Sequence, residues 1–221
     1  MNFPDNLLDE AWCWAAWAAW LPLFVRSVWR APWSRLKDSE QLNVWLGMIV
    51  LLTLVWSMKA GVKPGLNMHL LGASVFTLCF GPALAFIGLS LVLLGVTLND
   101  GAGVLAFALN SLLLAGCGVI FSKWINLAVN TLLPRHFFVY IFVNGFLGSA
   151  LMIVGVGSVL TLFLALAGAY SLEYLLADFL PYFILLGFSE AWLSGMVMTL
   201  FVIYRPEWVV TFDDSLYLSG K

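Results

Sequence analysis

Two ionisable side chains lie in strongly apolar parts of the sequence, and either could take part in chemistry. His69 opens the stretch 70–80, which contains no charged residue and is closed by Gly81-Pro82. Glu190 lies near the middle of the apolar stretch 179–204. Ionisable groups in such surroundings are costly to bury and often mark a functional site. A neutral imidazole is also a common metal ligand, so His69 is the first candidate for binding.

Each candidate also has a structural interpretation. A histidine can simply form a hydrogen bond where a helix begins. An ionised glutamate inside a membrane costs about 3 kcal/mol, so Glu190 must be neutral, partnered or beside a cavity, and we expect Asn110 to be its partner. Asn67 and Met68 come directly before His69. The thioether of Met68 can bind a soft metal, although single methionines usually fill gaps in packing.

Several kinds of protein are excluded because their motifs are missing. The sequence has no Walker A motif for ATP, no Gly-x-Ser-x-Gly element and no His-Glu-x-x-His pair. The second histidine, His136, follows Arg135 in a predicted loop at the opposite face, where it cannot share a haem with His69. An intramembrane enzyme with Glu190 or His69 as its base needs a nucleophile at the same depth, and none can be placed. We therefore expect neither an enzyme nor a permanently bound cofactor.

The composition is typical of a membrane protein. Hydrophobic residues make up 62% of the 221 residues and charged residues only 10%, with a mean hydropathy of +0.98. A soluble domain carries about 25% charged residues, so the solvent for most of this surface must be a lipid bilayer. The net charge of −2 gives no sign of a nucleic-acid partner. The three cysteines are far apart and predict neither a disulfide framework nor a metal site.

The apolar segments predict an all-α, polytopic membrane protein with about seven transmembrane helices in a single domain, residues 1–221. Asn6 should cap the first helix, because short polar side chains accept hydrogen bonds from the first free backbone amides. Residues 70–80 are too short to cross a membrane alone. They should form a short helix that breaks at Gly81-Pro82, and such breaks are tolerated inside protein or beside a cavity. The expected helices cover residues 7–29, 42–58, 70–80, 83–98, 103–121, 137–167 and 179–204.

The connections between these helices are expected to be polar loops. Asn126 and Asn130 should lie in the loop after residue 121 or at its edge, and Glu173 and Asp178 in the turn before the last helix. The first ten residues carry three acids and no base, unlike the positive start of a signal peptide. We therefore expect Met1 to be the mature amino terminus.

The basic residues predict the orientation in the membrane. Seven crossings place the two ends of the chain on opposite sides. With the amino terminus outside, eight Lys and Arg residues lie on the inner side and only Lys59 and Lys63 on the outer side. The positive-inside rule favours this placement, with a cytoplasmic carboxyl terminus. It also puts Met1 and His69 on the same, outer side.

Several motifs together resemble the CbiM/NikM family, the membrane components that select cobalt or nickel in energy-coupling-factor uptake transporters. They occur in the family's order and cover nearly the whole chain. The motifs are Met-Asn-Phe-Pro-Asp-Asn at 1–6, where the family has Met-His-Ile-Pro-Asp-Gly; His-Leu-Leu-Gly at 69–72 with Gly-Pro at 81–82; a turn at 100–102 before an asparagine helix at Asn110; and Gly-Phe-Ser-Glu-Ala at 187–191 with Arg-Pro at 205–206.

The resemblance implies a seven-helix bundle whose amino terminus is tucked inward. In the family, the free amine, the nitrogens of residue 2 and a loop histidine bind the metal in a flat arrangement of four nitrogens. Carried over, the ligands are Met1, Asn2 and His69, and nitrogen-rich planar sites suit Ni(II) and Cu(II). Residue 2 is asparagine where the family has histidine. One imidazole is therefore lost, and Met68 or Asp5 are candidate replacements.

The favoured hypothesis is the substrate-binding permease subunit of an energy-coupling-factor ABC transporter in the bacterial inner membrane. Its cargo would be nickel, cobalt or copper. The resemblance implies a separate ATPase subunit and a coupling transmembrane subunit as partners. Asn67, Asn110 and Glu190 are expected to support the site as structural polar groups. The alternative hypothesis is a metal-free membrane scaffold or assembly factor that kept the fold.

Overall fold

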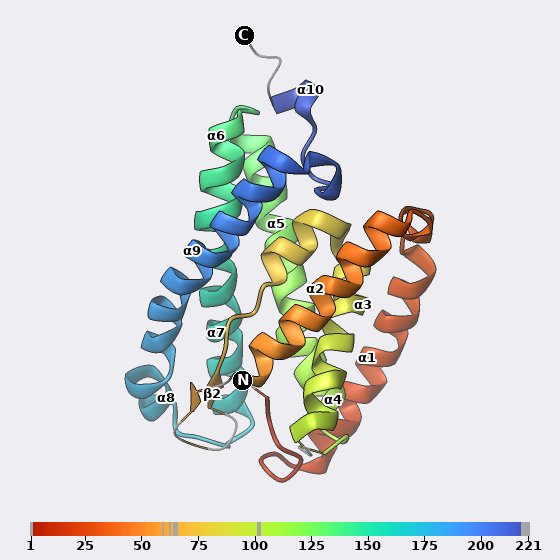
Figure 1. The fold of residues 1–221 in the computed structure, drawn as a ribbon. Helices are drawn as coiled ribbons and strands as arrows, with labels where there is room; N and C mark the ends of the chain where they lie inside the picture. Colours follow the sequence, from red (N-terminus) through yellow and green to blue (C-terminus); the bar gives the residue numbers. More distant parts are fainter. Residues whose placement is uncertain (1, 59, 62, 64–65, 101–102, 218–221) are drawn as a thin grey trace.

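The computed structural model shows long helices that run between the two ends of the molecule (Figure 1). It describes residues 2–58, 60–61, 63, 66–100 and 103–217. The long helical segments are α1 (Glu10–Arg30), α2 (Ser39–Ser57), α3 (Ala73–Asp100), the run α4, η2 and α5 (Phe107–Asn110, Ser111–Gly116 and Cys117–Leu132), the run α6, η3 and α7 (Phe137–Val139, Tyr140–Leu147 and Gly148–Leu166), and α9 (Leu180–Tyr204). The short elements are η1 (Trp33–Lys37), β1 (Ala60–Gly61), β2 (Asn67–Met68), α8 (Leu172–Asp178), η4 (Pro206–Trp208) and α10 (Asp214–Tyr217).

Five helical segments within the described part of the chain are long and apolar enough to cross a membrane. They are Ser39–Ser57, Ala73–Asn99, Phe107–Leu132, Phe137–Leu166 and Leu172–Tyr204. The helix α1 is not one of the five, although its 21 residues give a length of roughly 32 Å at 1.5 Å per residue. The predicted all-α membrane architecture is confirmed. The number of crossings, about seven, stays a prediction.

The short broken helix is present as predicted, within α3. Gly81 has φ 76° and ψ 167°, a conformation that is accessible almost only to glycine. Pro82 follows, and its ring prevents a continuous helix. Residues 73–80 therefore form a half-length helix. A segment without helix, residues 66–72, contains β2 and leads into this half-length helix, and we call this segment the strap. The prediction that the helix begins at residue 70 was wrong, because the helix begins after the strap.

The first helix begins three residues later than predicted. α1 starts at Glu10, and Asp9 rather than Asn6 is its N-cap residue. The amide of Leu7 donates instead to the carbonyl of Pro4. This turn directs the amino-terminal segment away from α1 and back among the helices (Figure 1).

The loop predicted after residue 121 is helical. α5 continues to Leu132, so Asn126 and Asn130 lie within it. Their amides do not end the helix, because Asn130 donates to the Asn126 side chain one turn earlier. The helix ends where Pro134 disfavours a helical conformation of the preceding residue, Leu133, which is extended.

The turn predicted before the last helix is also largely helical. Glu173 and Asp178 belong to α8, which Ser171 caps by accepting a hydrogen bond from the amide of Tyr174. A serine at this position satisfies one of the free amides of a helix start. The acidic Glu173 then lies in the first turn, where the helix dipole favours a negative charge.

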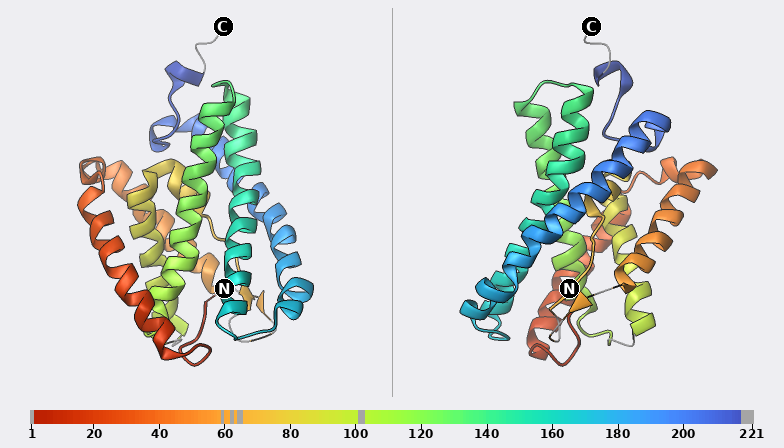
Figure 2. Two further views of the ribbon diagram at one scale, coloured as in Figure 1. Left: turned by 180° about the vertical axis from the view of Figure 1, so that it is seen from behind. Right: turned by 60° about the vertical axis from the view of Figure 1, so that its left-hand side comes forward.

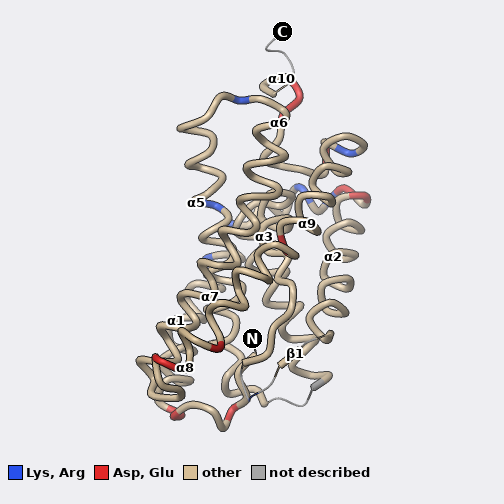
Figure 3. Tube along the Cα trace, turned by 90° about the vertical axis from the view of Figure 1, so that its left-hand side faces the viewer, with Lys and Arg blue, Asp and Glu red and all other residues tan. Residues whose placement is uncertain are grey.

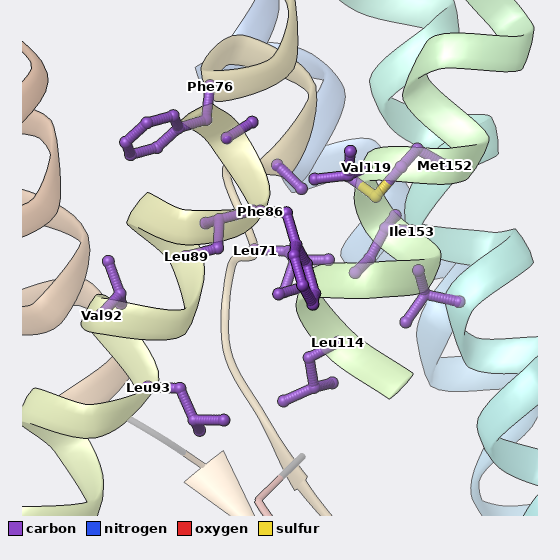
Figure 4. Packing of buried hydrophobic residues seen from close by; sticks show 14 of the residues in the cluster. Leu71, Phe76, Phe86, Leu89, Val92, Leu93, Leu114, Val119, Met152 and Ile153 are labelled. Atoms are coloured by element: carbon purple, nitrogen blue, oxygen red, sulfur yellow. The ribbon is translucent and has the colours of Figure 1, made fainter. Parts of the chain in front are cut away.

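The strap passes through the hydrophobic core. Leu71 of the strap is fully buried and lies among side chains of α3, η2 and α7, including Phe86, Leu114 and Ile153 (Figure 4). A Cβ atom at Gly118 of α5 would come within 3.0 Å of the Leu71 Cδ2 atom. Glycine is therefore needed for α5 to approach the strap, as small residues allow between membrane helices.

Charged residues gather at the two ends of the molecule. Most Lys and Arg residues lie toward the end that carries α6 and α10, whereas acidic residues at the start of α1 and in α8 lie at the opposite end (Figure 3). The two further ribbon views show that the amino-terminal segment and β2 lie at the α8 end (Figure 2). The strap rises from this end toward the middle of the bundle.

Candidate metal-binding site

The amino-terminal segment is fixed inside the bundle by Asn110 of α4. The Phe3 amide donates to Asn110 Oδ1 at 2.8 Å, and Asn110 Nδ2 donates to the Phe3 carbonyl at 3.0 Å. The Phe3 side chain is 1% exposed and stacks on Phe163 of α7. Asn2 is also buried. Residue 2 is therefore held at a defined place between helices.

Asp5 fixes the other side of this segment. Its carboxylate accepts hydrogen bonds from the amides of Leu105 at 3.3 Å and Ala106 at 2.7 Å, directly before α4. A carboxylate in this position satisfies free amides at a helix start, and the positive end of the helix dipole stabilises its negative charge. Because these bonds join residues about 100 positions apart, Asp5 and Asn110 together tie the start of the chain to one helix.

His69 lies in the strap and is buried against α2. Its ring is 4% exposed, and its centroid lies 4.7 Å from that of Trp56. His69 Nδ1 contacts the carbonyl oxygen of Leu70 at 3.1 Å. A carbonyl oxygen only accepts hydrogen bonds, so Nδ1 is the donor in this contact, and Nε2 is the ring nitrogen that could serve as a metal ligand.

Glu190 holds the strap from the other side. Its carboxylate accepts the Leu71 amide at 2.8 Å and the Gly72 amide at 2.7 Å, and the Ser194 hydroxyl at 3.4 Å. The side chain is 1% exposed. The prediction that Asn110 is its partner was wrong, because Asn110 binds the backbone of Phe3 instead. The partners of Glu190 are backbone amides, which are available because residues 70–72 lie outside any helix or strand.

Trp56 completes the polar contacts of the strap. Its indole Nε1 donates to the carbonyl of Leu71 at 3.2 Å. The Trp56 indole on α2 thus satisfies the carbonyl of Leu71, and the Glu190 carboxylate on α9 satisfies its amide. Irregular backbone inside a membrane is stable only when its polar groups are satisfied in this way. The strap therefore places His69 by contacts on both of its faces.

Asn67 and Met68 form β2, which pairs antiparallel with β1. Both are partly buried. Met68 lines a cavity of about 330 Å³ together with Lys63, Tyr174 and Asp178. The Lys63 ammonium lies 3.7 Å from the centre of the Tyr174 ring. Asn67 and Met68 thus lie at the partly exposed start of the strap, directly before His69.

The structure brings two of the predicted ligands to one region. Asn2 and His69 are buried, and the amino-terminal segment and β2 lie side by side in all three ribbon views (Figures 1 and 2). Asn2 Oδ1 is buried, and no described residue forms a hydrogen bond with it. The expected ligand Met1 lies outside the described residues. Among those described, no three His, Cys, Asp or Glu side chains form a group that could hold a metal ion.

The second histidine is far from this region. His136 precedes α6, at the opposite end of the bundle, and its Nδ1 accepts the amide of Phe138 at 3.2 Å. It acts as the N-cap of α6. The prediction that the two histidines lie at opposite faces is confirmed.

Residues 2–208 match the family described as CbiM, cobalt uptake substrate-specific transmembrane region. A search of curated proteins found no match. Two crystal structures resemble the fold at 19% sequence identity. A truncated transition metal transporter has a TM-score of 0.79, with 92% of this chain and 99% of that chain covered. A transition metal transporter has a TM-score of 0.76, with 92% and 93% covered.

These likenesses agree with the architecture described above, in which a broken helix and an extended strap lie within an all-α membrane bundle. The structural neighbours show the shared fold, and the family match spans nearly the entire chain. The chain belongs to the CbiM family of cobalt uptake substrate-specific transmembrane regions.

Proposed function

We propose that this protein is the substrate-binding membrane subunit of an energy-coupling-factor importer for a transition metal ion. The observation that carries the proposal is the burial of Asn2 and His69 on two neighbouring segments at one end of the bundle. The amino-terminal segment is fixed by polar contacts to α4 and the residues directly before it, and the strap by contacts to α2 and α9, so the protein itself positions the two residues. Pre-positioned ligands lower the entropic cost of binding.

The proposed ligands are the amine of Met1, the backbone nitrogen of Asn2 and Nε2 of His69. The backbone nitrogen of residue 2 would bind as the deprotonated amide, and the displaced proton would pass to solvent. Nitrogen donors in a flat arrangement favour Ni(II) or Cu(II), and cobalt is the cargo in the family description. Met68, Asp5 or a water would occupy the fourth position, where the family has a second imidazole.

The charge distribution supports an orientation with the amino terminus outside. Lys and Arg residues gather at the end of α6 and α10, which the positive-inside rule places in the cytoplasm (Figure 3). In this orientation the site opens outward and receives the ion from outside the cell. Because the sequence has no nucleotide-binding motif, transport would depend on a separate ATPase subunit and a coupling membrane subunit.

The proposal is tested by metal binding to purified protein with a free amino terminus. We expect His69→Ala to lose bound nickel, cobalt or copper in elemental analysis and calorimetric titration. His136→Ala is the matched control and should bind as the wild type does, because it lies at the opposite end. Equal binding by the wild type and His69→Ala would overturn the metal site. Absence of metal from all three proteins, with no ATPase co-purified, would favour the scaffold hypothesis.

A further inference from the structure

A cavity between α1 and α5 combines an apolar wall with three cations. It has a volume of about 530 Å³ and lies at the break of α3, with Pro82 and Ala83 among its lining residues. Arg26 and Arg30 reach it from α1 and Lys123 from α5. None of the described lining residues is acidic. Two helices far apart in the sequence therefore direct positive charge at one place.

The three cations have no partners within the described part of the protein. The ion pairs found there join Arg205 to Glu40 and to Glu207. No hydrogen bond from the Arg26, Arg30 or Lys123 side chain was found, and all three are exposed. Unlike Arg35 of η1, which binds Gln41 and the carbonyl of Glu207, these cations play no part in holding the fold together.

The rest of the cavity is apolar and open to the surroundings. Leu23 of α1 and Ile120 of α5 are each 48% exposed at its rim, and Phe86 of α3 is buried behind them. Ile120 belongs to a segment long and apolar enough to cross a membrane. The cavity thus joins a hydrocarbon-like wall to a positive end, and this end is the one richest in Lys and Arg (Figure 3).

From the apolar wall and the three cations of this cavity, we propose that it binds an anionic phospholipid of the inner leaflet. The phosphate of the headgroup pairs with Arg26, Arg30 and Lys123, and an acyl chain lies against Leu23, Phe86 and Ile120. Arginine is well suited to phosphate because its planar guanidinium can donate two parallel hydrogen bonds. Basic pockets between membrane helices bind acidic headgroups by this combination. A bound lipid would also contact both α1 and α5 next to the break in α3, and so stabilise the packing of these two helices.

The charge component is tested in nanodiscs of phosphatidylglycerol and of phosphatidylcholine. We expect phosphatidylglycerol to raise the melting temperature of the wild type and to remain bound in native mass spectrometry. The double variant Arg26→Gln/Lys123→Gln should bind phosphatidylglycerol roughly 30-fold more weakly, about fivefold for each cation removed. The control Lys37→Gln/Arg135→Gln removes two cations from the same end but outside the cavity, and should keep the lipid. Equal losses in both pairs would overturn the proposal.

The acyl-chain component is tested without changing any charge. A Cβ atom at Gly116, which lines the cavity, meets only Phe86 and the Ser111 carbonyl, both at 3.7 Å. Gly116→Leu therefore fills the cavity without a clash at Cβ, and we expect it to lose the lipid. Gly47→Leu on α2, where nothing lies within 4 Å of the added Cβ, is the control and should keep it.

Two further outcomes would contradict the lipid assignment. Inorganic phosphate at millimolar concentration should not reproduce the stabilisation, and an equal effect of phosphate would identify a small anion instead. A photo-crosslinking residue at Ile120 should capture lipid from native membranes, and capture of a polypeptide alone would assign the cavity to a protein helix. These results do not depend on metal binding, so the lipid site and the proposed function can fail separately.

Discussion

Asn110 and Phe3 exchange two hydrogen bonds, so a side-chain amide pairs with a backbone as a neighbouring strand would. The bonds are 2.8 Å and 3.0 Å long, and both residues are buried. This pairing joins α4 to the segment that carries two of the proposed metal ligands. The positions of these two proposed ligands should therefore depend on Asn110, which is not itself a proposed ligand.

Replacing Asn110 by alanine should lower both stability and metal affinity. The change leaves the amide and the carbonyl of Phe3 buried without partners, at about 1–3 kcal/mol for each unsatisfied group. Melting temperature in detergent and calorimetric nickel titration measure the two effects. Asn144→Ala is the control, because Asn144 is equally buried and its amide binds no described residue. Similar losses in the two variants would show that the Phe3 pairing is unimportant.

Glu190→Gln should loosen the strap. A glutamine amide has one acceptor oxygen, so either the Leu71 or the Gly72 amide would face another donor, at a cost of about 1–3 kcal/mol. Hydrogen exchange at these two amides should become faster, and the affinity of His69 for metal should fall. Glu173→Gln on the exposed start of α8 removes the same charge and should change neither quantity. Unaltered exchange in Glu190→Gln would refute this role.

Gly81→Ala should destabilise the protein through backbone strain alone. A Cβ atom there meets nothing closer than Val210 at 3.9 Å, but φ 76° and ψ 167° cost a non-glycine residue about 1–3 kcal/mol. Gly47→Ala in α2 should instead be neutral or stabilising by up to about 1 kcal/mol, because alanine favours a helix. Thermal unfolding of the two variants should therefore shift in opposite directions.

Asn2→His should strengthen metal binding and change its pH dependence. The variant supplies the imidazole that the family has at position 2. Each imidazole must be neutral to bind, with an ordinary pKa of about 6.5, so affinity rises with pH up to that value and falls as acid protonates the ring. Measured below pH 6.5, where the free imidazole is mostly protonated, the variant should release up to one more proton on binding nickel than the wild type does. Calorimetry in buffers of different ionisation enthalpy measures that number, and an unchanged count would contradict ligation by the new side chain.

The sequence was sufficient to predict the class of fold and the broken helix, whereas the roles of His69 and Glu190 in metal binding stay predictions. It could not predict the partners of Glu190 and Asn110, because both bind backbone groups more than 100 residues away. Every residue has these backbone groups, so no side-chain pattern reveals which of them are left without a partner in a helix and can bind a side chain. The end of α5 was also missed, because polar residues such as Asn126 remain compatible with a helix until Pro134 ends it.

The contact between Glu190 and the strap has a consequence for biosynthesis. The carboxylate and the Leu71 amide are separated by 119 positions, so the ribosome finishes six-sevenths of the chain before the strap can adopt its final conformation. Until α9 inserts, the Trp56 indole can bind the Leu71 carbonyl, but the Leu71 amide lacks its partner. A chain that ends before α9 would consequently contain His69 without the contacts of Glu190 that place the strap, so the proposed site would form only after α9 has been made.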